Sequence, residues 1–257
     1  MRGPGCEYAV EVRDLAVGYG AKTILHDVSF RVRRGEIVAI LGGSGCGKST
    51  LLKAVIGLLP VKEGEILIEG ESMVSSTPAE RRKIQRKCGV AFQGGALFGS
   101  DTVGVNIALP MEEYTNLSRE EIHRRVREKL HLVDLDGIED MMPGDLSGGM
   151  VKRAAVARAL ALDPDILFLD EPSAGLDPLN SARLDELIRS LRARLNAAVV
   201  IVTHELDSIF AIADRAVFLD RDAGTVIAEG PPAELRDHSP LEKVRIFLNR
   251  GHLERKE

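Results

Sequence analysis

The sequence contains few aromatic residues, few cysteines and no long apolar run. Its 257 residues include no Trp, and aromatic residues make up only 4% of them, so platforms for stacking single-stranded nucleic acid are scarce. Cys6, Cys46 and Cys88 have no metal-ligand spacing, and their odd number favours reduced thiols. The longest apolar runs, such as residues 197–202, are too short to cross a bilayer, and residues 1–6 lack the apolar segment of a signal peptide.

The charge and the overall composition narrow the class of protein further. A formal net charge of −5 gives no overall positive field that would attract nucleic acid or anionic lipid. With 44% hydrophobic and 28% charged residues, the chain has the composition of one large domain with a substantial core. We therefore expect a single domain over residues 1–257 and no nucleic acid partner. Any work at a membrane is expected to be done through a partner protein.

Two kinds of apolar pattern predict two kinds of strand. Residues 8–34 alternate between apolar and polar side chains, which is typical of half-buried strands in an antiparallel sheet. Continuous apolar runs, separated by helical patterns, predict strands that are buried on both faces of a mostly parallel sheet. These runs lie at residues 36–41, 89–92, 166–169, 199–202 and 216–219, and residues 64–70 predict a further strand.

Helical patterns fill the spaces between these strands. The leucines and other apolar residues of 48–59 predict a helix that Pro60 ends. Between about 96 and 162 the composition becomes helical, with Ile122, Val126 and Leu130 recurring at every fourth position. We therefore place a helical subdomain at about 96–162, inserted into an α/β core formed by residues of about 1–95 and 163–257.

A glycine-rich loop follows the apolar run at 36–41 and opens a helix. Residues 42–49 fit the pattern G-x-x-x-x-G-K-[ST], in which successive backbone N–H groups turn inward onto phosphate oxygens. Lys48 adds a positive charge, and Ser49 is the expected Mg²⁺ ligand. The candidate ATP-binding residues of this loop are Gly42, Gly43, Ser44, Gly45, Cys46, Gly47, Lys48, Ser49 and Thr50.

Two acids follow the apolar run at 166–169. Asp170 is placed to reach a metal ion through water, and Glu171 to polarise the attacking water. Two acids after a strand are also typical of a cap at the start of a helix. The phosphate-binding loop elsewhere in the chain favours the catalytic interpretation.

Three further side chains are candidates for the same site. Gln93 and His204 each follow a predicted strand, at the edge where open α/β sheets place ligands. Gln93 is a candidate for contact with Mg²⁺ or the attacking water, and His204 for contact with the γ-phosphate. Tyr19, between two glycines, is a candidate for stacking on adenine, with a turn aromatic that packs on the surface as the alternative.

Residues 146–150 form a second small-residue turn that opens a helix. Ser147, Gly148 and Gly149 offer backbone N–H groups and a hydroxyl at a helix N-terminus, which makes a second anion site. Because the loop at 42–50 already accommodates the phosphates, a second site on a distant segment suggests that two copies of the chain share each nucleotide.

Taken in order, these motifs resemble the nucleotide-binding subunits of ABC transporters over almost the whole chain. In the terms of that family they correspond to the A-loop aromatic (Tyr19), Walker A (42–50), the Q-loop (Gln93), the signature (146–150), Walker B (Asp170 and Glu171), the D-loop (173–177, ending in Asp177) and the switch (His204).

The resemblance implies an ATPase with an α/β fold. The expected fold is a P-loop NTPase (RecA-like) core with a mostly parallel sheet, an N-terminal antiparallel β subdomain and the inserted helical subdomain. ATP and Mg²⁺ are the implied cofactors, with Glu171, His204 and Gln93 in catalysis and with Ser49, Gln93 and, through water, Asp170 at the metal. The resemblance also implies a homodimer, in which Ser147, Gly148 and Gly149 of one copy face the γ-phosphate on the other copy's P-loop.

Met150 narrows the resemblance, because the family pattern usually has Gln at this position. The Met form, together with residues 92–98 and 109–113, resembles the MlaF-like branch, the ATPases of Mla/MCE phospholipid-transport systems. This implies phospholipid transport between inner and outer membranes, from a peripheral position on the cytoplasmic face of the inner membrane. The implied partners are an MlaE-like permease, docked around Gln93 and the helical subdomain, an MCE-domain MlaD-like protein and often a STAS-domain MlaB-like protein.

Two other functions and two surface features stay open from the sequence. A transporter ATPase for another cargo, such as an amino acid or a metal chelate, is the main alternative. A soluble ABC protein acting on DNA or ribosomes fits less well, because the chain has neither paired ATPase domains nor a long coiled-coil insertion. The basic run at 81–87 is either a lipid-headgroup contact or a solvated helix face. Residues 241–248 form either a partner-docking helix or a helix that packs on its own domain.

Overall fold

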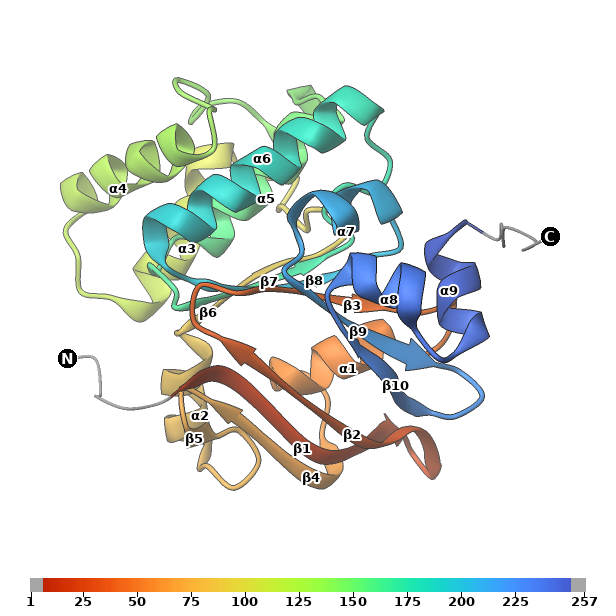
Figure 1. Ribbon diagram of the computed structural model, residues 1–257. Helices are drawn as coiled ribbons and strands as arrows, with labels where there is room; N and C mark the ends of the chain where they lie inside the picture. Colours follow the sequence, from red (N-terminus) through yellow and green to blue (C-terminus); the bar gives the residue numbers. More distant parts are fainter. Residues whose placement is uncertain (1–6, 251–257) are drawn as a thin grey trace.

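Two sheets organise the computed structural model, which describes residues 7–250 and so leaves Cys6 outside the described part. One sheet has four strands in the order β2-β1-β4-β5 and the other has six in the order β10-β9-β3-β8-β7-β6. Figure 1 shows the first sheet below the second, with helices α3 to α6 above both. No helix within residues 7–250 is long and apolar enough to span a membrane.

The four-stranded sheet confirms the antiparallel strands predicted at 8–34. Its strands are β1 (Tyr8–Tyr19), β2 (Lys22–Arg33), β4 (Val61–Ile68) and β5 (Glu71–Ser72). The antiparallel register places Val12 opposite Phe30 and Leu15 opposite Val28, and all four side chains are buried. The alternating pattern therefore gives this sheet one apolar face that packs into the core.

The six-stranded sheet contains every buried strand that the apolar runs predict. Its strands are β3 (Ile37–Leu41), β6 (Cys88–Ala91), β7 (Ile166–Asp170), β8 (Ala198–Val202), β9 (Arg215–Asp220) and β10 (Thr225–Gly230). The first five run parallel to one another, and every residue of β3 and β8 is buried. The apolar runs do not predict β10, an antiparallel edge strand whose residues are mostly only partly buried.

Six helices of the core surround these sheets in the described part of the chain: α1 (Lys48–Val55), α2 (Pro78–Gln85), α6 (Pro178–Leu195), α7 (Leu206–Ile212), α8 (Pro232–His238) and α9 (Glu242–Leu248). The prediction that α1 extends to Leu59 is wrong, because Gly57 adopts φ +77°, which a right-handed helix cannot include. In α9, Val244 and Leu248 are buried and the Phe247 ring meets Phe218 edge-on, so this helix packs on its own domain.

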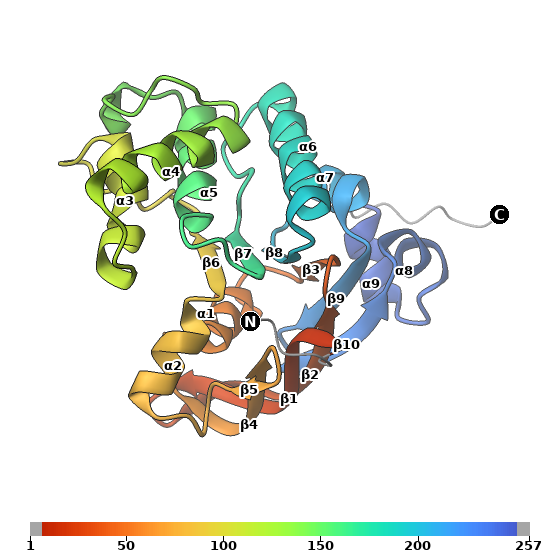
Figure 2. The same ribbon diagram turned by 90° about the vertical axis from the view of Figure 1, so that its left-hand side faces the viewer.

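The remaining helices form a layer that shares one apolar core with α6 and one face of the six-stranded sheet. They are α3 (Val103–Tyr114), α4 (Arg119–Leu132), the short 3₁₀ helix η1 (Pro143–Asp145) and α5 (Gly148–Ala159). Ile122, Val126 and Leu130 of α4 are buried against residues of α3 and α5, as their spacing predicts. Figure 2 shows this layer to one side of α6 and away from the four-stranded sheet.

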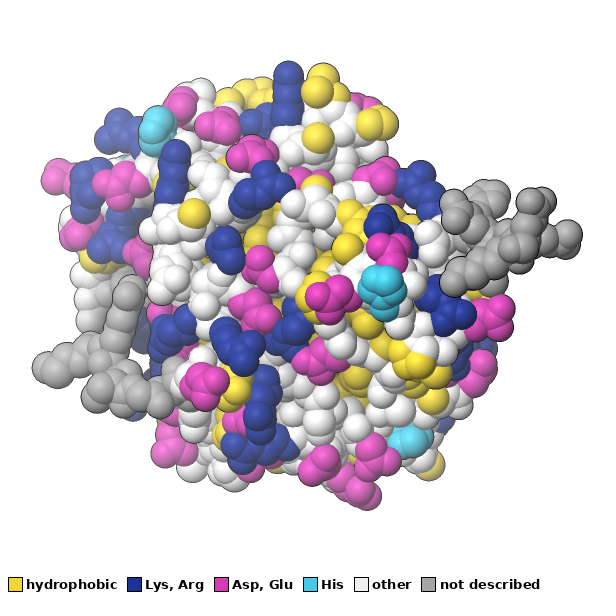
Figure 3. Space-filling model, viewed as in Figure 1, with side chains coloured by type: hydrophobic (Ala, Val, Ile, Leu, Met, Phe, Trp, Pro, Cys, Tyr) yellow, Lys and Arg dark blue, Asp and Glu magenta, His cyan; other side chains and the backbone are white. Residues whose placement is uncertain are grey.

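Charges of both signs are mixed on the surface. On the face seen in Figure 3, Lys and Arg side chains lie among Asp and Glu side chains. In the basic run at 81–87, Lys87 forms an ion pair with Glu71 and Arg81 donates hydrogen bonds to the backbone carbonyls of Val74 and Ser76. The other three basic side chains, Arg82, Lys83 and Arg86, are exposed, as in a solvated helix face.

Candidate functional site

The candidate catalytic residues meet at one edge of the six-stranded sheet. In the strand order β3-β8-β7-β6, each strand pairs with the next. The P-loop follows β3, His204 comes shortly after β8, Asp170 is the last residue of β7, and Gln93 comes shortly after β6. Because these strands are parallel, their carboxyl ends lie at the same edge. The structure therefore brings together four segments that are separated by up to about 160 residues in the sequence.

The P-loop connects β3 to α1 through glycines that its own chain requires. Gly42 has φ +144°, and a Cβ there would lie 2.3 Å from the carbonyl oxygen of Leu219. Gly47 has φ +104° and lies against the side chain of Leu25 on β2. No side chain caps the N-terminus of α1, so its first N–H groups stay available for phosphate oxygens. The Nζ of Lys48 meanwhile donates to the carbonyl oxygens of Gly42 and Gly43, at 2.8 and 3.1 Å.

Asp170 ends β7 with one oxygen that has no hydrogen-bond partner. Its Oδ1 is buried, and burial, followed by the charge of Glu171, raises the pKa of its carboxyl group. The positive charges of Lys53, Lys48 and Lys152 oppose this rise. Such an oxygen fits the hydration water of a hard cation, because Mg²⁺ prefers oxygen and keeps several of its waters. Within residues 7–250, no group of three His, Cys, Asp or Glu side chains is arranged to hold a metal ion by itself.

Glu171 is held in an uncommon backbone conformation beside β8. Its φ of +48° lies in the left-handed region, which a non-glycine residue keeps only where its surroundings fix it. Its N–H donates to the carbonyl oxygen of Val202 at 2.8 Å, and the hydroxyl of Thr203 donates to Oε2 at 3.2 Å. Nδ1 of His204 lies 2.8 Å from Oε1. These contacts orient the buried carboxylate, whereas the His204 ring is largely exposed.

Lys152 is a residue of this site that the sequence analysis missed. It lies on α5 and donates to the carbonyl oxygens of Gln93 and Glu171, the second at 3.3 Å. Burial lowers the pKa of its ammonium group, while the charges of Glu171 and Asp170 oppose that change. The available signal was a lysine two positions after Met150, on the helix that the signature turn opens.

The signature turn lies beside the D-loop of the same chain and is not joined to the P-loop. Ser147 caps α5, with its hydroxyl accepting a hydrogen bond from the N–H of Met150 at 3.3 Å. Within residues 7–250, no hydrogen bond or ion pair links residues 146–150 to the P-loop. A Cβ on Gly148 would meet only Leu176, at 3.8 Å, and one on Gly149 would come no closer than 3.6 Å, to Asn180. Neither glycine is required by the fold of its own chain.

Two predicted residues lie at the margins of these sites. Asp177 caps α6, and hydrogen bonds from Asn180 and Leu179 lower the pKa of its carboxyl group. Tyr19 lies at the tip of the β1–β2 hairpin, where its side chain is 49% exposed. The hairpin borders the P-loop, since Leu25 lies against Gly47. Tyr19 is therefore on a hairpin next to the P-loop, and its stacking on adenine stays a prediction.

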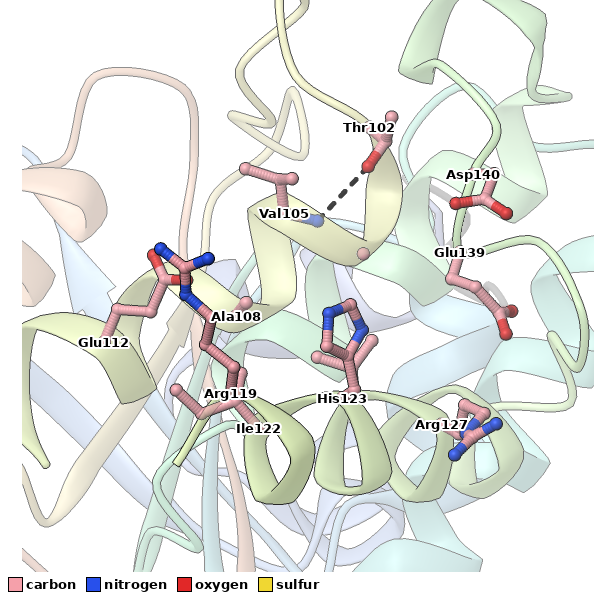
Figure 4. A pocket seen from close by; sticks show the side chains of 12 residues that line it. Thr102, Val105, Ala108, Glu112, Arg119, Ile122, His123, Arg127, Glu139 and Asp140 are labelled. Carbon is pink, nitrogen blue, oxygen red and sulfur yellow. Dashed lines mark hydrogen bonds between the residues drawn. The ribbon is translucent and has the colours of Figure 1, made fainter. Parts of the chain in front are cut away.

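A separate hollow lies within the helical layer. It has a volume of about 560 Å³ and lies between α3, α4 and the segment around Glu139. Figure 4 shows Val105 and Ala108 on α3 and Ile122 on α4 among its apolar residues, with His123, Arg127 and Glu139 among its polar residues. None of the candidate catalytic residues lines it.

Comparisons with known proteins identify the family. A family model described as ABC transporter matches residues 25–174. The intermembrane phospholipid transport system ATP-binding protein MlaF of Haemophilus influenzae is 38% identical over 93% of this chain and 89% of its own length. This chain belongs to the ABC transporter family. It is an ATP-binding, ATP-hydrolysing subunit of that family, as the motifs predict.

Other relatives of this ABC ATPase include one that is named for a different cargo. A probable ribonucleotide transport ATP-binding protein of Mycobacterium leprae is 42% identical, over 94% of this chain and 69% of its own length. The solved structure of cbiO1 from Clostridium perfringens, part of an ABC transporter complex, has a TM-score of 0.82 and 30% identity and covers 95% of this chain and 97% of its own. The cassette MJ0796, solved as a dimer bound to ADP and Pi, has a TM-score of 0.78 and 31% identity and covers 86% of this chain and 98% of its own. The predicted fold class is confirmed.

Proposed function

We propose that this ATPase energises phospholipid transport between membranes, as a homodimer that hydrolyses ATP at two shared sites. The 38% identity to the MlaF proteins of Haemophilus influenzae and Escherichia coli, together with Met150, supports the phospholipid cargo. The 42% identity to a relative named for ribonucleotide transport makes a nucleotide cargo the second candidate.

The observation that carries the shared site is the free space around the signature glycines. A glycine is needed where φ is positive or where another group approaches the backbone closely. Gly148 and Gly149 have neither a positive φ nor a neighbour of their own chain within 3.5 Å of a Cβ. We infer that a group from outside the chain approaches them closely, and the helix N-terminus favours an anion there. We assign this role to the γ-phosphate of ATP on the P-loop of a second copy.

Hydrolysis follows from the groups at the sheet edge. The N–H groups of the P-loop and Lys48 hold the phosphates, once Lys48 leaves the loop carbonyls with which it bonds. Ser49, Gln93 and, through water, Asp170 would hold Mg²⁺, which neutralises charge on the phosphate oxygens. Glu171 accepts a proton from the attacking water, while Thr203 and His204 keep its carboxylate in place.

Partner docking is supported by an apolar face that follows Gln93 in the chain. Phe98, Val105, Leu109 and Tyr114 are large apolar side chains that are between 40% and 51% exposed. Exposed apolar groups that gather in one region mark interaction sites. We assign this face to a cytoplasmic segment of an MlaE-like permease, which would place the ATPase peripherally at the inner membrane, in a complex with an MlaD-like and an MlaB-like protein.

A subunit-mixing experiment tests the shared site. Lys48→Ala disables the P-loop half and Gly148→Asp the signature half, so each homodimer has two defective sites. In a mixed dimer, one site combines both defects and the other is intact. Equal mixing should recover about a quarter of wild-type ATPase activity, because half of the dimers are mixed. Complete inactivity of the mixture, with both variants folded and mixed dimers formed, would contradict sharing across two copies.

Purification of the native complex tests the partner and the cargo. The tagged chain should retain a membrane permease and bound phospholipid, both identified by mass spectrometry. Leu109→Asp should release the permease, because it places a charge in the apolar face. Leu58→Asp is the matched control, since Leu58 is 61% exposed but lies outside the helical layer. Recovery of nucleotides in place of lipid would favour the second candidate cargo.

A further inference from the structure

Lys152 connects the helix that follows the signature turn to the sheet edge where the candidate catalytic residues lie. It lies on α5, the helix that Ser147 caps, and reaches the backbone of Gln93 and of Glu171 at the sheet edge. Both acceptors are carbonyl oxygens, and an ammonium group has three donors, so one lysine can bond both at once. The signature helix is thereby tied to two candidate catalytic segments of its own subunit.

Arg158 forms a second connection from the same helix. Its guanidinium group donates to the carbonyl oxygens of Gly95 and Ala96, at 3.0 and 2.6 Å. These two residues have φ values of +75° and +51°, so the segment after Gln93 is held in a left-handed turn. A Cβ on Gly95 would lie 2.9 Å from the side chain of Val151. The segment after Gln93 and α5 therefore pack as one unit.

The backbone of Glu171 depends on a small number of contacts. Its left-handed φ needs support from its surroundings, and the N–H end is fixed by Val202 on β8. The carbonyl oxygen accepts two hydrogen bonds, one from the N–H of Ala174 in the same loop and one from Lys152, each at 3.3 Å. Among the hydrogen bonds of residues 7–250, the one from Lys152 is the contact by which the helical layer reaches Glu171.

We propose that Lys152 is a positioning residue, which makes the placement of Glu171 depend on the position of the helical layer. When α5 is seated against the sheet edge, Lys152 holds the carbonyl of Glu171 and its carboxylate faces the nucleotide. When α5 moves away, Glu171 loses that support and hydrolysis slows. This inference rests on the proposed role of Glu171 as the group that activates water.

A double-mutant cycle in the full-length chain tests the inference. Lys152→Met keeps the length of the side chain and removes its donors, and we expect kcat for ATP to fall about 10-fold, because small misplacements at a reacting centre slow turnover strongly. KM should stay within about twofold, because Lys152 bonds no P-loop group. Lys152→Arg, which restores a cationic donor, should recover most of the lost rate.

The cycle is completed in the Glu171→Gln background. A residue that acts through Glu171 has no effect once that carboxylate is gone, so the single-turnover rates of Glu171→Gln and of Glu171→Gln with Lys152→Met should be equal. An equal fold loss in both backgrounds, or an unchanged kcat in Lys152→Met, would overturn the inference. If Glu171→Gln itself hydrolyses ATP at the wild-type rate, the proposed function of Glu171 fails instead.

Controls separate positioning from folding. Arg127→Met removes a cation from the exposed surface of α4 that has no hydrogen bond or ion pair within residues 7–250, and its kcat should match wild type. Thermal unfolding and ATP binding are measured for every variant. If Lys152→Met does not fold, Lys152→Leu takes its place in the cycle, because its side chain has no hydrogen-bond donor. A kcat in Lys152→Leu equal to wild type would also overturn the inference.

Discussion

The P-loop and the signature turn of this ABC ATPase, which we propose as the two halves of a shared phosphate site, have opposite surroundings. At the P-loop, Gly42 is required by its own chain, since a Cβ there would overlap the carbonyl of Leu219. At the signature turn, Gly148 has open space around it and an ordinary φ. The fold of the chain thus requires glycine at Gly42 of the P-loop, whereas at Gly148 it leaves the space that the proposed shared site needs. Substitutions can separate these two sources of constraint.

The largest expected effect is on the half-site at the sheet edge. Glu171→Gln should lower ATP turnover by about 100-fold or more, because it removes the group that accepts a proton from water. ATP affinity should stay close to wild type, since the P-loop is untouched, and ATP should then trap a stable dimer. Turnover is measured by phosphate release and dimerisation by light scattering. The matched control is Glu186→Gln, an exposed acid on α6 that pairs with Arg189, and it should hydrolyse ATP normally.

If Glu171→Gln retains most of its activity, another group activates the water. Glu171 would then not be the group that accepts the proton, while the different surroundings of Gly42 and Gly148 would be unaffected. If the variant is inactive but does not dimerise with ATP, the sheet edge is catalytic and the signature does not close over a partner's nucleotide.

The sheet edge was predictable from sequence because each of its parts has a local signature. The P-loop spacing, the apolar runs and the polar residues that follow them indicate where strands end, and parallel strands bring their ends together. Lys152 had no such signature, because its partners are backbone carbonyls that only the packing of α5 brings near. The early end of α1 depends on Gly57, which lies against Met73 and Gln85 in the folded chain.

The open space around Gly148 and Gly149 could not be predicted from the sequence either. A glycine looks the same whether its own chain or a ligand demands it, and only the neighbouring atoms tell these cases apart. Gly42 and Gly148 both belong to turns that open helices, and their different surroundings appear only in the structure.

An intermediate effect is expected from alanine at these two glycines. Gly148→Ala should leave the free energy of unfolding nearly unchanged, because its Cβ makes an ordinary contact with Leu176. ATP turnover should fall about 10-fold, since the methyl group displaces a phosphate from the helix N-terminus. Gly42→Ala should instead destabilise the chain by about 2 kcal/mol, because its Cβ would overlap backbone at a positive φ.

Urea denaturation and steady-state ATPase assays check this pair. We expect Gly42→Ala to lower the free energy of unfolding. We expect Gly148→Ala to lower ATPase activity and to leave the free energy of unfolding unchanged. An unstable Gly148→Ala variant would show that the signature turn is constrained by its own chain after all. Normal ATPase activity in that variant would mean that no phosphate approaches the turn closely.

The smallest effect is expected at Met150, the residue that separates this signature from the usual pattern. The backbone N–H of Met150 bonds the Ser147 hydroxyl, and its side chain packs partly buried against the helical layer. Met150→Gln leaves that backbone donor in place and exchanges one unbranched side chain for another. We expect ATP turnover to stay within about threefold of wild type, because substitutions of partly exposed side chains usually change free energies only slightly. A tenfold change in either direction would place this side chain in contact with the partner's nucleotide, and the signature would then depend on side chains as well as on its backbone.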